Sequence, residues 1–208
     1  MEEILNKYSL LKDQNVPRET LLEFESFVDM LIRKNDQINI ISKETAKNDV
    51  IRNRHILDSA QIIDFIDFNS KNIIDIGSGG GMPGIIVSIM IKNMERNLKV
   101  ILYEKSHHKC AFLKKASKDL KLNTVVIKKN IFEEENLDTG TIMTRAFKPL
   151  PIVLDLVFKN FKNYKNLIIF MGKSGEKVLE ETLNSWEFDF EKKQSITNED
   201  SFLLNIKN

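Results

Sequence analysis

One stretch constrains the fold more than any other part of the chain: residues 73–84, with the sequence Ile-Ile-Asp-Ile-Gly-Ser-Gly-Gly-Gly-Met-Pro-Gly. The apolar run at its start predicts a short buried strand, and the glycines that follow disfavour regular structure. Pro83 suits the first turn of a helix. We therefore expect a strand, a glycine loop and a helix, with a backbone that a ligand can approach closely because glycine has no Cβ.

Two ligand classes compete for this loop. Gly79, Gly81 and Gly84 satisfy G-x-G-x-x-G, the dinucleotide fingerprint, which would indicate an NAD(P)-dependent oxidoreductase. The longer pattern D-x-G-x-G-x-G, which starts at Asp75 and Gly77, resembles the loop of class I S-adenosylmethionine (SAM) methyltransferases. A carboxylate at the strand end suits the cationic amino-acid end of SAM, directly or through water, better than it suits a pyrophosphate. This charge favours SAM, with NAD(P) as the alternative.

The composition narrows the class of protein. With 208 residues, 42% of them hydrophobic, the chain can bury one substantial core and an extension. Cys110 is the only cysteine, which excludes an internal disulfide, and no run of about 18 apolar residues predicts a membrane span. Residues 1–11 lack the long apolar run of a secretory signal. We expect a soluble, cytoplasmic protein that binds neither a metal nor a membrane, with a monomer favoured.

The charge is uneven although the net charge is only +1. Residues 99–130 hold nine Lys and two Asp or Glu, a net charge of +7. Such a block is either a solvated helix face or a surface that contacts phosphate. In the second interpretation Lys128 and Lys129, which follow an expected strand, contact RNA.

The order of the expected elements predicts a doubly wound α/β sheet. Helices are expected at residues 21–32, 83–93, 106–120, 152–161 and 176–183, and strands at 73–76, 98–103, 124–127, 141–146, 166–171, 186–190 and 202–206. The last two strands have no long helix between them and should pair antiparallel. This is the class I SAM-dependent methyltransferase architecture, with a Rossmann-like sheet and a closing antiparallel hairpin. We expect an N-terminal helical extension at residues 1–68, packed on a SAM-binding domain at residues 69–208.

In such a sheet the carboxyl ends of the strands face the ligand. Glu104 ends the second strand, 23 residues after Gly81, close to the ~20-residue offset of an acidic residue that binds a ribose hydroxyl. Asn130, Ile131 and Phe132 follow the third strand and are candidates for contacts to an adenine, or form only a strand exit.

Arg145 ends the fourth strand and is the best candidate for an active-site residue outside the glycine loop. The guanidinium group of an arginine at this point can donate paired hydrogen bonds to a carboxylate, a phosphate or the edge of a nucleobase. Arg54 and His55 precede Asp58 by about one helical turn. His55 and Asp58 form a structural pair in one interpretation, and in the other Arg54 and His55 contact an RNA phosphate or base near the cofactor.

These motifs together resemble the RsmG (GidB) family, bacterial enzymes that methylate N7 of a guanine in the 530 loop of 16S ribosomal RNA. The resemblance spans nearly the whole chain and is carried by Asn35-x-x-x-Asn39, Arg54–Ser59, Asp75–Gly84, Phe112-Leu113 and Thr144–Phe147. It implies SAM contacts at Gly77, Met82, Ile131, Phe132 and Arg145, with Asp75, Gly79, Gly81 and Glu104 beside them. It also implies 16S rRNA or the small ribosomal subunit as partner.

The chain departs from the family pattern at several basic positions. The family usually has an arginine where Asn130 stands, a lysine where His108 stands, Lys-Gly at Met171-Gly172, and an Arg-His pair near Ser201-Phe202. These differences remove basic side chains from the surface that is expected to contact RNA, although Lys128, Lys129 and Lys173 are neighbouring substitutes. They also keep a third alternative open, a SAM- or RNA-binding module without catalysis.

The resemblance implies direct displacement, in which the N7 lone pair of guanine takes the sulfonium methyl group in line. Because N7 bears no proton, this reaction requires no general base. Arg145 is then a positioning residue for SAM or for the guanine edge. Arg54, His55 and the basic block contact rRNA.

Overall fold

The computed structural model describes residues 8, 11, 16–42 and 50–208. Predictions for the other residues, which belong to the expected helical extension and the N-terminal segment, lie outside the described residues. The described helices are α2 (Arg18–Asn35), η3 (Ile51–Leu57), α4 (Asp58–Ala60), η4 (Gln61–Phe65), α5 (Gly84–Asn93), α6 (His107–Asp119), η5 (Ile131–Glu133), α7 (Leu150–Asn160) and α8 (Gly175–Leu183). The described strands are β1 (Asn72–Ile76), β2 (Lys99–Tyr103), β3 (Thr124–Ile127), β4 (Leu137–Asp138), β5 (Thr141–Arg145), β6 (Phe161–Lys162), β7 (Asn166–Met171), β8 (Phe190–Gln194) and β9 (Phe202–Lys207).

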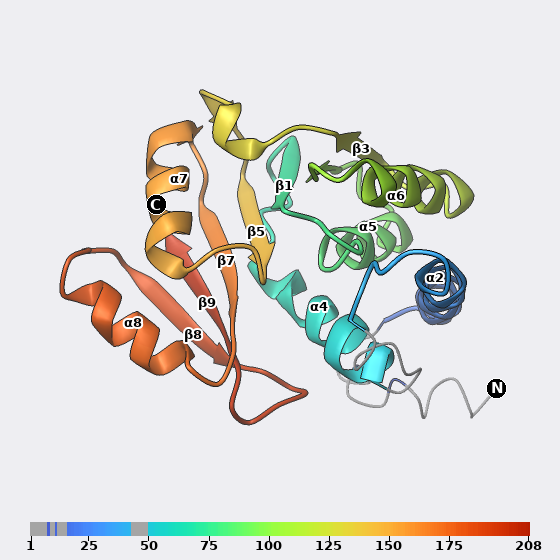
Figure 1. The fold of residues 1–208 in the computed structure, drawn as a ribbon, viewed down its shortest axis with the longest axis horizontal. Coiled ribbons are helices and arrows are strands. Elements are labelled where there is room, and N and C mark those ends of the chain that lie inside the picture. Colours follow the sequence, from blue (N-terminus) through green and yellow to red (C-terminus); the bar gives the residue numbers. More distant parts are fainter. Residues whose placement is uncertain (1–7, 9–10, 12–15, 43–49) are drawn as a thin grey trace.

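Seven strands form the central sheet, in the order β3-β2-β1-β5-β7-β9-β8 (Figure 1). The first five are parallel, and β9 runs antiparallel to both β7 and β8. The predicted doubly wound sheet with a closing antiparallel hairpin is therefore confirmed. A two-stranded sheet of β4 and β6 was not predicted, because two-residue strands leave no periodic signal.

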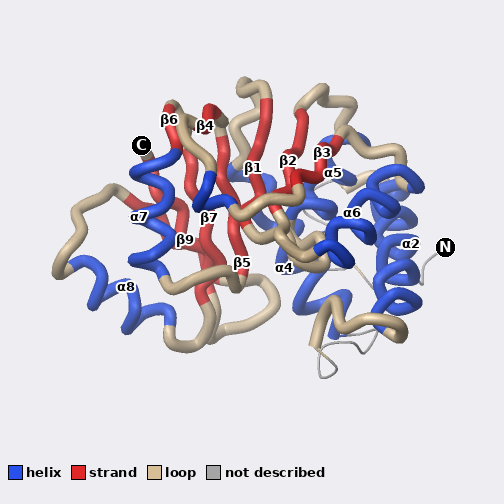
Figure 2. The backbone as a smooth tube through the Cα atoms, turned by 45° about the horizontal axis from the view of Figure 1, so that its top comes forward, coloured by secondary structure: helices blue, strands red, loops and turns tan. Residues whose placement is uncertain are grey.

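Helices cover both faces of the sheet (Figure 2). Successive side chains of a strand point to opposite faces. Ile73 of β1 accordingly packs with α2, α5 and α6, whereas Ile74 and Ile76 pack with α7 and α8. Because both faces are buried, the parallel strands are almost continuously apolar, as the sequence of β1 is.

Helix α2 confirms the helix predicted at residues 21–32. It begins after Pro17, and Phe24, Phe27 and Leu31 lie on its buried side. These side chains belong to the same apolar cluster as side chains of the sheet. The division of the chain at residue 68 stays a prediction, since one core joins residues from both sides of it. In the part of the chain that is described, no helix has the length and apolar character of a membrane span.

The strand predicted at residues 186–190 is wrong. Residues 186–189 form no strand, and β8 begins only at Phe190, which pairs with Ile206. Trp186 and Phe188 instead pack against the α7 side of the core. The strand that does form is mostly polar and lies at the sheet edge, where lysines are usual and an apolar alternation is not required.

The burial of α2 leads to a stability prediction. Phe24 is fully buried, whereas Leu22 on the same helix is 44% exposed. Phe24→Ala should lower the free energy of unfolding by about 3–5 kcal/mol, because it removes buried contacts and leaves a cavity. Leu22→Ala, the matched control, should change it by less than about 0.5 kcal/mol. Denaturant unfolding of both variants measures the difference, and equal losses would contradict the packing described here.

Candidate functional site

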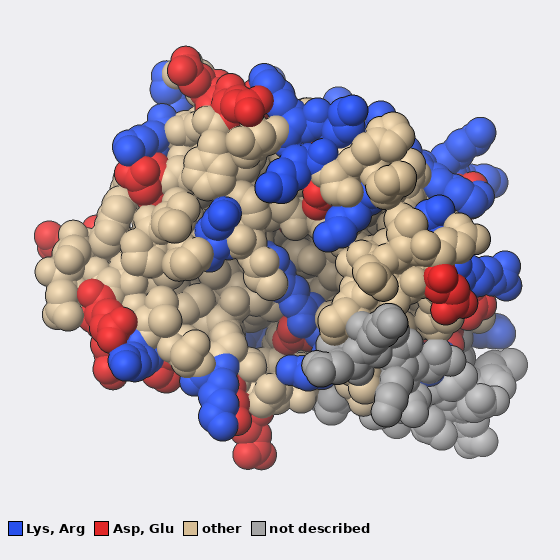
Figure 3. All heavy atoms as spheres, in the orientation of Figure 1, with Lys and Arg blue, Asp and Glu red and all other residues tan. Residues whose placement is uncertain are grey.

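A cavity of about 500 Å³ opens at the carboxyl ends of the parallel strands. Its wall comes from residues 77–80 after β1, 103–105 at the end of β2, 129–132 after β3 and 145–148 at the end of β5, with His55, Met82 and Lys109. Figure 3 shows a hollow near the middle of this face, with Lys and Arg side chains on its margin. The volume is in the range that holds a small-molecule ligand or cofactor.

The glycine loop provides the floor of the cavity. Gly77, Gly79 and Gly81 have φ values of 70°, 53° and 92°, a left-handed conformation that favours glycine. A Cβ on Gly77 would lie 2.4 Å from Cδ2 of Phe147, so this side chain packs directly on the backbone. Gly77, Gly79 and Met82 line the cavity as predicted, with Gly80, whereas Gly81 does not line it.

Glu104 also lines the cavity and is nearly buried. Its Oε2 accepts a hydrogen bond from Gly79 N–H at 3.0 Å, and its Oε1 accepts one from Ser106 N–H at 2.7 Å. Each carboxylate oxygen can accept a further hydrogen bond. The arrangement therefore joins the glycine loop to α6 and still offers acceptors to ligand hydroxyls.

The structure places Asp75 behind the glycine loop, which corrects the contact expected of it. The side chain is 1% exposed, does not line the cavity, and accepts a hydrogen bond from Gly84 N–H at 3.0 Å. Burial raises the pKa of Asp75 to about 7, and this outweighs the hydrogen bonds that favour its charged form. The charge argument that favoured SAM over NAD(P) therefore has no support in this geometry.

Apolar groups close the cavity on the β3 side. Asn130 caps the short helix η5, Ile131 is buried, and Phe132 is 42% exposed. Phe132 stacks on Phe147, with ring centroids 5.9 Å apart and an interplanar angle of 22°. All four residues line the cavity. Phe147 was missed as a site residue, although it directly follows the Thr-Arg-Ala segment that ends the strand.

Arg145 enters the cavity from the end of β5, as predicted. Its Nη2 lies 3.0 Å from Oδ2 of Asp58 and also donates to the carbonyl oxygen of Arg54. The predicted pairing of His55 with Asp58 is wrong, because Asp58 takes Arg145 as its charged partner. Among the described residues, Nη1 of Arg145 and Nε2 of His55 are buried and have no hydrogen-bond partner. Both side chains line the cavity, and these two nitrogens keep an unused hydrogen-bonding capacity behind its surface.

His55 lines the cavity as a neutral imidazole. Burial lowers its pKa most, the positive charges of Arg145 and Arg54 act in the same direction, and together they bring it to about 4. A neutral ring offers a hydrogen bond to a ligand but no charge to a phosphate. Arg54 is exposed and does not line the cavity.

Lysines surround the cavity more densely than predicted. Lys129 lines it, but its ammonium group pairs with Glu134 at 2.7 Å. Lys105, Lys109 and Lys148 line it as well and were missed, although each follows a strand or begins a helix. Lys128 and Lys173 are exposed outside the cavity wall. In the described ranges, no cluster of three or more His, Cys, Asp or Glu residues could hold a metal ion.

A second, smaller cavity of about 140 Å³ adjoins the first. It lies at the ends of β5 and β7 and at the starts of α7 and α8, and Ala146, Phe147 and Lys148 line both cavities. Gly172 lines the smaller cavity, and a Cβ there would have no neighbour within 4 Å. The site thus has two compartments that share one wall.

Comparisons with known proteins agree with one another. The family model GidB, described as rRNA small subunit methyltransferase G, matches residues 20–202. A ribosomal RNA small subunit methyltransferase G from Pelagibacter ubique (strain HTCC1062) is 73% identical over 207 residues, which cover 100% of this chain and 97% of the relative. The protein of that name from Rickettsia felis is 35% identical, over 93% of this chain and 96% of the relative. A SAM-dependent methyltransferase from Aquifex aeolicus has a similar fold, with a TM-score of 0.57 at 14% identity over 73% of this chain and 89% of that one.

The raised pKa of Asp75 predicts a pH dependence of stability. Between its ordinary value of 3.8 and its folded value of about 7, the unfolded chain loses this proton and the folded chain keeps it. Stability should therefore fall as the pH rises through this window, by up to about 1.4 kcal/mol per pH unit from this group. Asp75→Asn should remove that contribution, because the amide does not ionise.

Unfolding free energies of the wild type and Asp75→Asn at pH 5 and pH 7 test this expectation. Asp119→Asn is the matched control, because Asp119 pairs with Lys115 on an exposed helix face. Parallel pH profiles for the wild type and Asp75→Asn would show that Asp75 is ionised in the folded protein.

Proposed function

The chain belongs to the GidB family, rRNA small subunit methyltransferase G, and we propose that it transfers a methyl group from SAM to N7 of a guanine in the 530 loop of 16S ribosomal RNA. One observation carries the proposal. The cavity above the glycine loop also contains an arginine whose Nη1 has no partner among the described residues, and a basic rim surrounds it. This combination suits a small-molecule donor that must meet a nucleic acid.

SAM fits the larger cavity by the chemistry of its wall. The loop backbone at Gly77 and Gly79 can approach the ligand closely, and Glu104 accepts hydrogen bonds from ribose hydroxyls. Ile131 and Phe132 provide an apolar seat for adenine, and Asn130 lies beside them. When bound, SAM supplies an electrophilic methyl group on a sulfonium sulfur.

The family assignment excludes the alternative of an NAD(P)-dependent oxidoreductase.

Gly81 and Asp75 keep a role in this proposal, but an indirect one. Gly81 allows the left-handed turn of the loop, and Asp75 holds Gly84 at the start of α5. Both shape the loop that contacts SAM in this proposal, although neither residue lines the larger cavity.

We place the target base in the smaller cavity. It shares Phe147 with the larger cavity, so a base there lies next to the methyl donor, and an aromatic face is available for stacking. Extrusion of a base from folded RNA into such a pocket is the usual solution when an enzyme must reach one atom of the base. Gly172 keeps this compartment open.

The chain's own groups then act by positioning. N7 of guanine carries a lone pair and no proton, so its methylation requires no general base. Arg145 contributes the free Nη1 donor, and His55 contributes a neutral ring nitrogen. Both suit hydrogen bonds to the polar edge of a base or to a carboxylate of the donor.

Phosphate contacts are assigned to the basic rim. Lys105, Lys109, Lys129 and Lys148 line the cavity, and Lys128, Lys173 and Arg54 directly adjoin residues that line it or the smaller cavity. Figure 3 shows Lys and Arg side chains on the margin of the hollow. Lysines hold RNA mainly through phosphate charge and set its position rather than its sequence. They take the place of the lysines and arginines that the family usually has at or near His108, Asn130, Met171 and Ser201, where this chain has neither. The active unit in this proposal is one chain in the bacterial cytoplasm, acting on free 16S rRNA or on the small subunit.

Transfer of labelled methyl from SAM to small-subunit rRNA tests the function. The rRNA is taken from cells that lack the modification, both naked and as particles, and the labelled nucleotide is mapped. We expect label at N7 of a 530-loop guanine. Bound SAM without label on any rRNA would favour a SAM-binding module without catalysis, and no SAM binding would overturn the proposal.

Arg145→Ala should slow methyl transfer by about a hundredfold or more, to a rate that labelled methyl still measures, and leave the chain folded. The substitution removes the free donor, while Asp58 keeps its hydrogen bonds from Gln61 and Ser195. Lys159→Ala, which breaks an exposed pair with Asp155 on α7, is the control and should transfer at the wild-type rate. Methyl transfer and thermal unfolding are measured for both, and an Arg145→Ala variant as active as the wild type would contradict the assigned role.

Gly172→Val should narrow the target-base compartment. Gly172 is one of the residues that line the smaller cavity, and an added Cβ there meets no neighbour within 4 Å, so the chain accommodates a valine without a clash. We expect a higher KM for rRNA and a slower transfer, with the Kd for SAM unchanged. Gly172→Ala, which adds less volume, should have a smaller effect. Unchanged rRNA kinetics in Gly172→Val would place the target base elsewhere.

A further inference from the structure

Asp58 lies 8% exposed at the start of α4, and both oxygens of its carboxylate are engaged. Oδ2 pairs with Nη2 of Arg145 at 3.0 Å. Oδ1 accepts hydrogen bonds from Nε2 of Gln61 at 2.7 Å and from Oγ of Ser195 at 2.9 Å. One carboxylate therefore joins three segments that are distant in the sequence.

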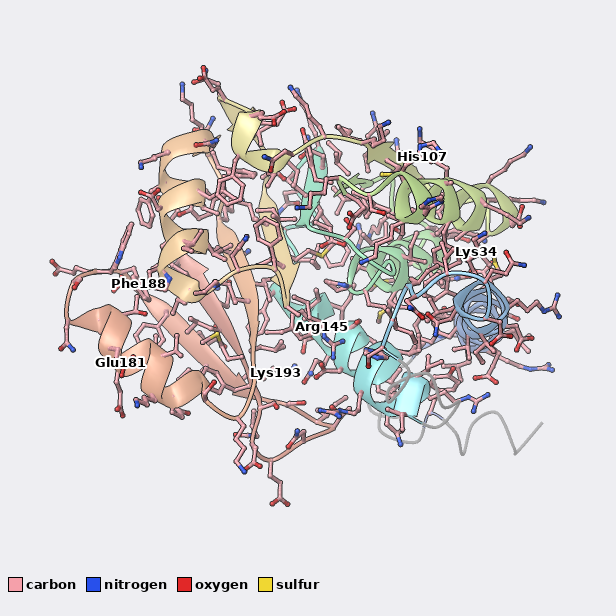
Figure 4. The ribbon with its side chains drawn as sticks, viewed as in Figure 1. Lys34, His107, Arg145, Glu181, Phe188 and Lys193 are labelled. Carbon is pink, nitrogen blue, oxygen red and sulfur yellow. The ribbon has the colours of Figure 1, made fainter. Side chains whose placement is uncertain are left out.

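Oγ1 of Thr197 is a third donor to Oδ1, at 3.4 Å, and the two closer donors are themselves held. Ser195 belongs to the turn between β8 and β9, and Gln61 belongs to η4. Oε1 of Gln61 accepts a hydrogen bond from Ile196 N–H at 3.1 Å, which ties the turn to the helical segment a second time. Lys193 adds an ion pair with Asp64 at 2.6 Å. The closing hairpin is thus joined to the segment that carries Asp58. Figure 4 labels Lys193 of the hairpin and Arg145.

The guanidinium group of Arg145 makes its ion pair and hydrogen bond through Nη2 and none through Nη1. Its Nη2 is shared by Asp58 and the carbonyl oxygen of Arg54, and its guanidinium lies over the ring of Phe170, 5.3 Å from the centroid. A guanidinium is planar, so fixing Nη2 also fixes the direction of Nη1. Nη1 is buried and has no hydrogen-bond partner among the described residues, and Arg145 lines the larger cavity.

We propose that Asp58 is a positioning residue of this site: it holds Arg145 by Nη2 and so fixes the guanidinium in the cavity wall that the bound ligand meets, and Gln61 and Ser195 hold the carboxylate in place. The proposal rests on the proposed function only in giving Arg145 a part in methyl transfer. It makes the hairpin turn a structural support of the site, although residues 195–201 line neither cavity. A small misplacement of a positioning group is known to slow catalysis strongly.

Two substitutions of Asp58 separate positioning from packing. Asp58→Asn keeps the size and leaves Oδ1 as acceptor, but it places an amide NH₂ opposite Nη2. Asp58→Glu keeps the charge and adds a methylene group to a buried position. A purely structural role predicts that Asn is tolerated better, whereas positioning through charge predicts that Glu retains more methyl transfer.

For Asp58→Asn we expect kcat to fall by about tenfold or more, with thermal unfolding within a few degrees of the wild type. Combined with Arg145→Ala, it should cause no further loss, because both changes remove the same interaction. Asp155→Asn, which breaks an exposed pair with Lys159 on α7 outside this network, is the control and should retain the wild-type kcat. Losses that multiply in the double variant, or Asn outperforming Glu, would overturn the proposal.

A second readout does not depend on methyl transfer. In the ¹⁵N spectrum of the arginine side chains, where Arg145→Lys identifies the signal of Arg145, the wild type should show a guanidinium with hindered rotation. Asp58→Asn should release it, and an unchanged signal would overturn the positioning role even if the chain methylates no rRNA. If Asp58→Asn does not fold, Ser195→Ala decides: a mobile Arg145 and slower transfer support the proposal, and wild-type values for both overturn it.

Discussion

The backbone conformation after β1 is the constraint on which the rest of the site depends. Three glycines adopt left-handed φ values there, and the ring of Phe147 lies against Gly77 where any side chain would collide with it. This contact brings the end of β5 onto the loop after β1. The same contact sets Arg145 and the shared wall of the two cavities beside the glycine loop.

Buried carboxyl groups organise this region and leave the cations to face the ligand. Asp75 holds the start of α5, Glu104 joins the glycine loop to α6, and Asp58 joins Arg145 to the hairpin turn. A buried carboxyl group requires hydrogen bonds or a cation, so each of them is stable only in the complete fold. The lysines around the cavity, in contrast, keep their charges near solvent, where these charges attract a polyanionic partner.

Much of the fold was predictable because its signals are local. The parallel strands are apolar runs, α2 has a helical stripe from Leu21 to Ile32, and the closing strand β9 lies at residues 202–207 as expected within one residue. The edge strand β8 was misplaced, because its pairing with β9 and not its own pattern decides where it begins. Arg145 was correctly placed among the strand ends that line the cavity, since the carboxyl ends of parallel strands share one edge of the sheet.

The sequence by itself determined the order of the elements, the glycine loop and the edge of the sheet at which a ligand binds, because periodicity and glycine content act within a few residues. Only the tertiary structure decided which partner each charged group takes. The carboxyl group of Asp75 accepts a hydrogen bond from Gly84 and does not line the cavity. Asp58 pairs with Arg145 and not with His55, and Phe147 lines both compartments. The contacts of Asp58 and Phe147 join segments far apart in the chain, and burial and hydrogen bonding select among such contacts only once the sheet has formed.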